Sequence, residues 1–288
     1  MNNMKNDMYE QKNFKYYASM AFKYLVLWIS VTIVILPLIT VFLGSFKGHE
    51  ELLTSSPLAL PKDFSNFSNF ITAWTKGNMA TGFINTIVIL IVSLLATILT
   101  GTMTAYVLAR FNFKGKKFVK FLFLLASLIP SITMQMSVFQ IIVGLGVYNT
   151  RWATIILYAG TDIISIYIFL QFLQGISVSL DEAAIIDGAS FPQIFFKIII
   201  PLLKPAIVTV IIIKGIGFYN EFYTPYLYMK DKSLQVISTS LYAFQGPYGT
   251  QWEVICAACL ITMLPTLIVF LLLQKHIYGG LTNGAVKG

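Results

Sequence analysis

Charged residues are scarce in this chain of 288 residues: Asp, Glu, Lys and Arg together make up 11% of it, whereas 57% is hydrophobic. Several apolar runs reach about 20 residues, which is enough to cross roughly 30 Å of hydrocarbon as a helix. A water-soluble domain has no use for so many runs of this length, so the composition excludes one. Because backbone polar groups in lipid must be bonded within their own helix, we expect an all-α, polytopic membrane protein.

Histidine and cysteine are also rare, with two of each. Cys256 and Cys259 form a CAAC sequence inside an apolar run, with no second pair and no histidine close in the sequence. This pattern favours apolar packing over a metal or redox site. We therefore predict no metal and no cofactor.

The sequence lacks a phosphate-binding loop of the form G-x-x-x-x-G-K-[ST]. The nearest glycine-rich stretch, GGLTNGAVKG, has no Lys-Ser/Thr pair after its glycine. No nucleophile, base and orienting group stand out as a set. We therefore expect that the chain is not an enzyme and does not hydrolyse ATP alone.

Six membrane spans are predicted, at residues 23–45, 82–109, 119–144, 152–174, 204–221 and 253–274. The first has no convincing cleavage site, so we interpret it as a span and not as a signal peptide. Pro37, Pro130 and Pro265 are expected to kink or break their helices. The domain division that follows is a tail at 1–22, a transmembrane domain at 23–274 and a tail at 275–288, with long outer segments at 46–81 and 222–252.

Basic residues predict the orientation. With the N-terminus inside, the inner segments hold about twice as many Lys and Arg residues as the outer ones. This places both termini and the loop at 177–203 in the cytoplasm. The net charge of +8 then matches anionic lipid of the inner leaflet, and no nucleic-acid partner is predicted because no basic stripe with interleaved aromatic residues occurs.

The loop that begins DEAAIIDGASFPQ interrupts the membrane pattern at residue 181. Ser179 stands three residues before Glu182, which predicts a capping box, and Gly188 is placed to end the short helix in the left-handed conformation. Ser190 and Gln193 predict a second capped helix that continues through FFKIIIP into the fifth span. The loop is therefore expected to be an ordered structure.

The first of these helices has an acidic and small-residue surface. Its aliphatic face consists of Ala183, Ala184, Ile185 and Ile186, and the carboxylates around it are Asp181, Glu182 and Asp187. An amphipathic helix lying on anionic lipid is the alternative, but such a helix is rich in lysine. The composition favours a socket for a partner protein instead.

EAAIIDGAS followed by IIIPLLKP resembles the EAA loop of permease subunits in ATP-binding-cassette importers. Further stretches resemble the carbohydrate-uptake branch, the maltose-type second permease: GSFK, the pair Asn85 and Thr86, AYVLARFNFKGKK, YNE and GAVKG. The sequence departs from the family in having Tyr219 for the usual Trp, Ser177 for the usual Pro and Ile200 for the usual Leu. These departures lie outside the centre of the EAA motif.

The resemblance implies a type I importer fold in a bacterial cell membrane and several partners. These are two separate ATPase subunits, a second permease subunit that is a different chain, an extracellular substrate-binding protein, and an oligosaccharide or sugar acid as substrate. It assigns contact with the ATPase to Glu182, Ala183, Ala184, Asp187, Gly188 and Lys287. It assigns contact with the binding protein to Gln245, Gly246, Pro247 and Tyr248.

Two charged residues fall inside predicted spans, Asp162 and Lys214. An unpaired charge there costs at least ~2.5–3.5 kcal/mol, so each either faces a water-filled cavity or pairs with the other. Pairing is favoured because consecutive spans are often neighbours, and it predicts a neutral or mildly acidic oligosaccharide. The candidate substrate path consists of Asp162, Lys214, Gln171, Tyr167, Tyr219, Asn220 and Glu221.

Two alternatives stay open. One is an importer of the same kind for a solute other than a sugar. The other is an ion-coupled secondary transporter in which Asp162 is the coupling carboxylate, although no inverted repeat supports it.

Overall fold

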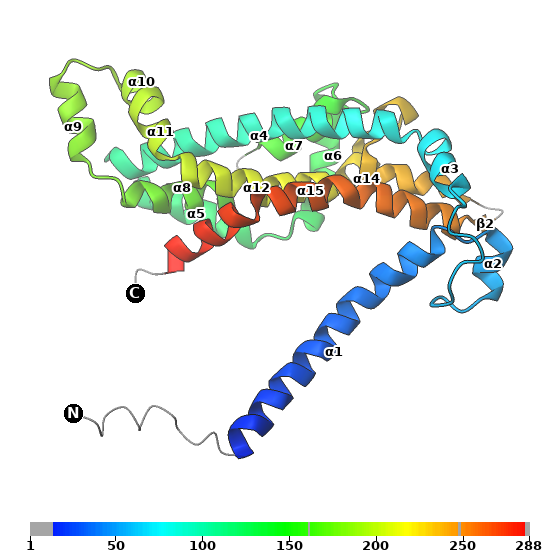
Figure 1. Ribbon diagram of the computed structural model, residues 1–288. Coiled ribbons are helices and arrows are strands. Elements are labelled where there is room, and N and C mark those ends of the chain that lie inside the picture. Colours follow the sequence, from blue (N-terminus) through cyan, green and yellow to red (C-terminus); the bar gives the residue numbers. More distant parts are fainter. Residues whose placement is uncertain (1–13, 161, 247–248, 286–288) are drawn as a thin grey trace, which may run out of the picture.

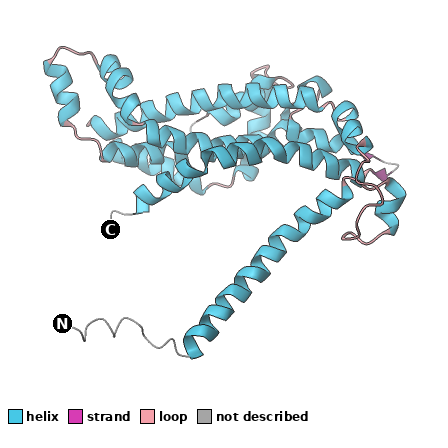
Figure 2. Ribbon diagram, in the orientation of Figure 1, coloured by secondary structure: helices cyan, strands magenta, loops and turns pink. Residues whose placement is uncertain are grey.

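The computed structural model describes residues 14–160, 162–246 and 249–285, and these residues are mostly helical (Figures 1 and 2). The first half contains α1 (Phe14–Gly44), α2 (His49–Thr54), α3 (Ser68–Lys76), α4 (Met79–Arg110), α5 (Lys116–Leu128), η1 (Ser131–Met134), α6 (Gln135–Gly144) and α7 (Arg151–Ala159). The second half contains α8 (Ile163–Gln174), α9 (Ser179–Ile186), α10 (Phe191–Ile194), η2 (Phe195–Ile199), α11 (Ile200–Leu202), α12 (Lys204–Asn220), α13 (Tyr223–Tyr228), η3 (Lys232–Leu234), α14 (Ile237–Ser240), η4 (Leu241–Phe244) and α15 (Trp252–Ala285).

The only strands in the described part of the chain form a small hairpin. β1 (Gln245–Gly246) pairs antiparallel with β2 (Gly249–Thr250), with Gln245 opposite Thr250. The predicted all-α class is confirmed apart from this hairpin. In Figure 1 it lies with α2 and α3 at one end of the bundle, which we call the hairpin end, and α9 and α10 lie at the opposite end, the α9 end.

Within the described residues, four stretches are long and apolar enough to cross a membrane: α1, α4, α7 together with α8, and α15. Two bent pairs raise the number to six if each pair is one span. In one pair, α5 meets the helix from Ile132 to Gly144 at 90°, and in the other the segment Phe191–Leu202 meets α12 at 71°. The predicted third span is therefore present as a broken helix, whereas the predicted fifth span is the continuous helix α12, with the bend just before it.

Proline explains both breaks. Pro130 has no N–H group and restricts the residue before it, and Ile129 accordingly adopts an extended conformation after α5. The predicted continuous helix from Phe191 into the fifth span is wrong, since the chain bends at Leu203. Pro205 has no N–H group to donate to the carbonyl of residue 201, and in a continuous helix its ring would clash with that carbonyl. By contrast, Pro37 lies inside the continuous helix α1, and Pro265 lies likewise inside α15.

The predicted fourth span is also divided, because α7 ends at Ala159 and α8 begins at Ile163. Asp162 is the N-cap of α8, and its carboxylate accepts from the backbone N–H of Ser165 at 3.0 Å. The charged residue that interrupts the apolar run thus starts a helix. A cap of this kind satisfies one of the N–H groups that a helix leaves unpaired at its start.

Helix α4 is the centre of the bundle, and it packs against α7, α8, α12 and α14 along its length (Figure 1). Close packing depends on small residues: a Cβ atom on Gly101 would meet the ring of Phe169 at 3.1 Å, and Ala105 is fully buried. The largest apolar core is formed by α4, α8 and the chain from α9 to α12. It lies toward the α9 end and gives the EAA segment a rigid base.

Helix α1 stands apart from the rest. It leaves the bundle at the hairpin end and diverges from it in Figure 1. Its most apolar 18 residues include no buried residue, and of its described side chains only the last two, Leu43 and Gly44, are buried. Large side chains such as Phe22, Trp28 and Ile33 are exposed along it. A helix that is apolar on all sides and unburied requires lipid or another apolar protein surface around it.

Candidate functional site

The EAA segment folds as the short helix α9, a glycine turn and a second helix start. The predicted capping box between Ser179 and Glu182 is wrong: the N-cap is Val178, and the Ser179 hydroxyl lies instead 2.7 Å from that of Ser177. The predicted glycine turn is confirmed, since Gly188 has φ +82°. A β-branched or bulky residue strongly resists this conformation, so the glycine sets the angle between the two helices.

The second predicted cap is also confirmed. The backbone N–H of Ser190 donates to Oε1 of Gln193 at 2.8 Å, and Pro192 occupies the first turn, where its missing N–H costs nothing. The two helices of the loop therefore start and end at defined residues. In Figure 1 α9 lies at the far end of the bundle, opposite the hairpin.

A buried polar cluster fastens α9 to the end of α4. Asp181 accepts from the hydroxyl of Tyr106 at 2.9 Å, and its other carboxylate oxygen lies 3.0 Å from Nε of Arg110. Nη2 of Arg110 also donates to the carbonyl of Ile176 at 2.9 Å. The side chains of Asp181 and Arg110 are 8% and 9% exposed, so this is a buried ion pair.

Asp181 was expected among the carboxylates on the docking surface, and that expectation is wrong because its charge is used inside the chain. Sequence reasoning missed the partners, Tyr106 and Arg110. They stand one helical turn apart at the end of α4, so both reach the same side of that helix. This spacing is the one signal in the sequence that indicated the cluster.

The outward surface of α9 is smaller than expected. Ala184 is only 8% exposed and packs into the core, so the structure does not offer it to a partner. Glu182, Ala183 and Asp187 are exposed, together with Ile186 at 85%. Among the described residues, neither exposed carboxylate of this surface has a side-chain hydrogen bond or ion pair. We call this exposed group, with Ile185, the α9 face.

The two charges within the spans pair with each other. Nζ of Lys214 in α12 lies 2.6 Å from Oδ1 of Asp162, and the two side chains are 18% and 17% exposed. The predicted pairing is confirmed. Asp162 also accepts hydrogen bonds from the backbone and hydroxyl of Ser165, so its second oxygen is satisfied as well.

Comparison with known proteins gives this arrangement a family. Residues 97–282, which include α9 and both members of the ion pair, match the family described as "Binding-protein-dependent transport system inner membrane component". The chain belongs to this family. The hypothesis of an ion-coupled secondary transporter is thereby rejected. The permease is a membrane component of a transporter that works with a binding protein.

Several curated permeases are similar to it over most of their length. The diacetylchitobiose uptake system permease protein NgcG of Streptomyces coelicolor is 30% identical over 94% of this chain and 89% of its own. The melibiose/raffinose/stachyose import permease protein MelC of Bacillus subtilis is 34% identical over 81% of this chain and 85% of its own. The arabinooligosaccharides transport system permease protein AraQ of Halalkalibacterium halodurans is 31% identical over 89% of this chain and 92% of its own.

A solved structure confirms the fold. It is a chain of a bacterial ABC transporter involved in the import of the acidic polysaccharide alginate, with a TM-score of 0.81. The match covers 91% of the permease and 98% of that chain at 20% sequence identity. The predicted importer fold is therefore correct.

The structure does not gather the seven predicted pathway residues into one site. Only Asp162 and Lys214 contact each other through a polar interaction. The Glu221 carboxylate accepts from the Tyr158 hydroxyl at 2.8 Å and from two backbone N–H groups at the start of α13. The hydroxyl of Tyr219 donates to the carbonyl of Thr262 at 2.8 Å, and that of Tyr167 donates to the carbonyl of Lys120 at 3.2 Å. Gln171 and Asn220 are exposed.

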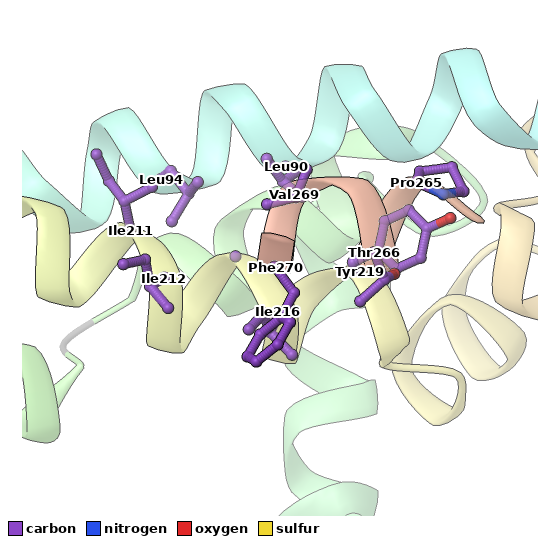
Figure 3. Close-up of a pocket in the computed structure, with 11 residues that line it drawn as sticks. Leu90, Leu94, Ile211, Ile212, Ile216, Tyr219, Pro265, Thr266, Val269 and Phe270 are labelled. Carbon is purple, nitrogen blue, oxygen red and sulfur yellow. The ribbon is translucent and has the colours of Figure 1, made fainter. Parts of the chain in front are cut away.

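A pocket of about 180 Å³ lies between α4, α12 and α15 (Figure 3). Its walls are almost entirely apolar side chains, among them Leu90, Ile212, Ile216 and Phe270. A sugar requires hydrogen bonds to its hydroxyl groups, and these walls do not supply them. The pocket therefore does not suit a sugar.

The predicted binding-protein segment is only partly described. Gln245 and Gly246 form β1 and are exposed at the hairpin end. Pro247 and Tyr248 lie outside the described residues, and so does Lys287 near the C-terminus. The hairpin at least shows that the segment is ordered where it leaves η4.

Proposed function

We propose that this permease is the membrane-spanning subunit of an ATP-driven sugar importer and that separate ATPase subunits bind its α9 face. The observation that carries the proposal is an exposed acidic and aliphatic helix held on the bundle by a buried ion pair. Glu182 and Asp187 offer two unpaired carboxylates beside the exposed Ile186. A complementary ATPase surface has basic groups around an apolar groove.

The buried polar cluster at Asp181 supports a mechanical role for α9. A partner that moves α9 also moves whatever is attached to it, and here the attachment is a buried carboxylate shared by Tyr106 and Arg110. Closure of two ATPase subunits on ATP would displace α9 and, through it, the bundle. Alternating access to the two sides of the membrane follows from such a displacement.

The exposed helix α1 supports a second permease subunit. Because its apolar sides touch little of its own bundle, α1 is available to pack against a partner within the membrane. We infer that the partner is a different permease chain. Surrounding lipid covers the sides that the partner leaves free.

The distribution of basic residues supports the orientation. In this orientation the α9 end and both termini lie in the cytoplasm of a bacterial cell, and the hairpin end faces outward. The segment around Gln245 then contacts the extracellular binding protein, and the tail that contains Lys287 contacts the ATPase. The domain division at residues 22 and 274 is retained as part of this proposal.

We infer that the substrate is a neutral oligosaccharide. Asp162 lies 2.6 Å from Lys214 and neutralises it, so this lysine is not available as a free cation that favours a sugar acid. The names of three similar permeases point to diacetylchitobiose, melibiose, raffinose, stachyose and arabinooligosaccharides, which are neutral sugars. Another relative, 26% identical, is named for sulfoquinovosyl glycerol, which is anionic.

The test is copurification of the permease with its ATPase subunits. Glu182→Lys reverses a charge on the α9 face and should abolish ATPase binding and sugar uptake, while the amount of permease in the membrane stays normal. Glu50→Lys, which reverses an exposed charge at the hairpin end, is the matched control and should leave both unchanged. Retention of the ATPase and of uptake by Glu182→Lys would show that α9 is not the docking helix.

A further inference from the structure

Asn85 and Thr86, the NT pair of the sequence, form a buried polar pair in α4. They lie near the hairpin end of α4, and both side chains are buried, Asn85 completely. Nδ2 of Asn85 donates to the carbonyls of Ser233 and Gln235 at 2.9 and 2.8 Å. The Thr86 hydroxyl accepts from the backbone N–H of Ile237 at 2.9 Å. Both residues therefore hold one segment of the outer loop.

That segment, residues 233–240, we call the strap. It lies directly on α4: a Cβ atom on Gly82 would meet Oγ of Ser240 at 2.7 Å and the backbone of Ile237 at 3.3 Å. Nε2 of Gln235 adds a hydrogen bond to the carbonyl of Gly77 at 2.6 Å. Only η4 separates the strap from the hairpin. A force on the hairpin therefore reaches α4 through these contacts.

Helix α4 connects the strap to the α9 end without a break. It is a single helix of 32 residues with no proline, and at 1.5 Å per residue it is roughly 48 Å long. Its last turn carries Tyr106 and Arg110, which hold Asp181 of α9. One rigid element thus has a buried polar attachment to the outer loop at one end and to α9 at the other.

We propose that α4 transmits the arrival of the binding protein to the ATPase, and that Asn85 and Thr86 are the positioning residues that fasten the strap to it. This inference rests on the proposed function, in which the hairpin contacts the binding protein and α9 contacts the ATPase. In this inference a displacement passes from the hairpin to the strap, from the strap to α4, and from α4 to α9. The attachments have to be stiff at both ends, because a loose one would absorb the displacement.

The experiment uses the complete importer in lipid vesicles and compares ATPase activity with and without sugar-loaded binding protein. Thr86→Val keeps the side-chain volume but removes the acceptor of the Ile237 N–H, whereas Thr86→Ser keeps a hydroxyl. We expect Thr86→Val to lower the stimulation by binding protein about fivefold or more, with basal ATPase activity and assembly unchanged. Thr86→Ser should retain the stimulation.

Hydrogen exchange of the Ile237 amide shows whether the strap has been released. Asn85→Leu, which removes both donors to the strap and also the acceptor of the Arg151 Nε–H, is the second variant. Faster exchange together with lost stimulation supports the proposal. Faster exchange with normal stimulation overturns it, and so does an equal loss of basal activity and stimulation, which indicates a purely structural role.

A second experiment tests the attachment of α4 to α9. Tyr106→Phe removes the hydroxyl that donates to Asp181. Because both changes interrupt one relay, the double variant with Thr86→Val should lose no more stimulation than the single variant with the larger loss. Multiplied losses would overturn the relay. Failure of the proposed function is recognised separately. If α9 is not the docking helix, the Glu182→Lys variant keeps its ATPase subunits whether or not Thr86 is also substituted.

Discussion

The ion pair between Lys214 and Asp162 gives a quantitative test of how this bundle is held together. Lys214→Met leaves the carboxylate of Asp162 unpaired between α8 and α12, at a site where the two side chains are 18% and 17% exposed. Asp162→Asn leaves the ammonium group unpaired, but it retains the helix cap, because Asn caps a helix about as well as Asp does. The double variant carries no charge at this site.

The expected costs follow from burial. An unpaired charge at the centre of a membrane helix costs about 2.5–3.5 kcal/mol on insertion scales, and breaking one side of a buried pair costs about 3–5 kcal/mol in soluble proteins. We therefore expect each single change to lower the free energy of unfolding by about 3 kcal/mol. The double variant should lie within about 1 kcal/mol of the wild type, because a neutral pair carries no desolvation penalty.

The assay is unfolding of the purified permease in mixed micelles by titration with denaturing detergent. Lys62→Met, which removes an exposed lysine at the hairpin end, is the matched control and should have no measurable effect. With these costs the interaction energy of the double-mutant cycle should be about 5 kcal/mol. If the two single costs simply add in the double variant, the charges do not stabilise each other. If Lys214→Met is stable and loses only the uptake of anionic sugars, Lys214 is a substrate residue.

Two further predictions concern the ends of the bundle. Gly188→Val forces a β-branched residue into φ +82°, at a cost of at least about 1–2 kcal/mol, and should reduce ATPase binding, whereas Gly48→Ala, at φ −72°, should be neutral. At the hairpin end, hydrogen bonds from the backbone and hydroxyl of Ser233 lower the pKa of Asp231 below its ordinary value of 3.8. The stability that these hydrogen bonds give to the folded strap is therefore present above pH 3.8, and it is lost as the pH falls through the lower pKa of Asp231 in the folded state. Asp231→Asn should remove this acid dependence from the hydrogen exchange of the strap, and an unchanged acid profile in that variant would contradict the assignment.

Local signals in the sequence were enough to predict much of the α9 segment. The left-handed turn at Gly188 and the cap formed by Ser190 and Gln193 each involve residues within a few positions of one another. Hydropathy likewise indicated where the apolar runs lie, because crossing lipid requires a continuous stretch of the chain. The pairing of Asp162 with Lys214 was within reach for a similar reason, since two isolated charges in lipid have few alternatives.

Tertiary structure alone decided which side chains are available to partners. Asp181 reads as one more exposed carboxylate of an acidic helix, yet it is buried against Tyr106, 75 residues earlier in the chain. Asn85 reads as a polar interruption of an apolar run, yet it holds a loop 148 residues away. Neither partner is encoded near its residue, because such contacts depend on how the helices pack and not on periodicity.

The same limit applies to the shape of the spans. The run at 119–144 bends by 90° beside Pro130, and the chain bends by 71° at Leu203, before the fifth span begins. Hydropathy averages over a run and therefore predicted neither angle. It also gave no reason to separate α1 from the others, although α1 alone leaves the bundle in Figure 1. Composition determined that this chain enters the membrane, because hydropathy is a property of each segment by itself. Packing determined which surfaces remain exposed for partner molecules, because the burial of a side chain depends on two segments in contact.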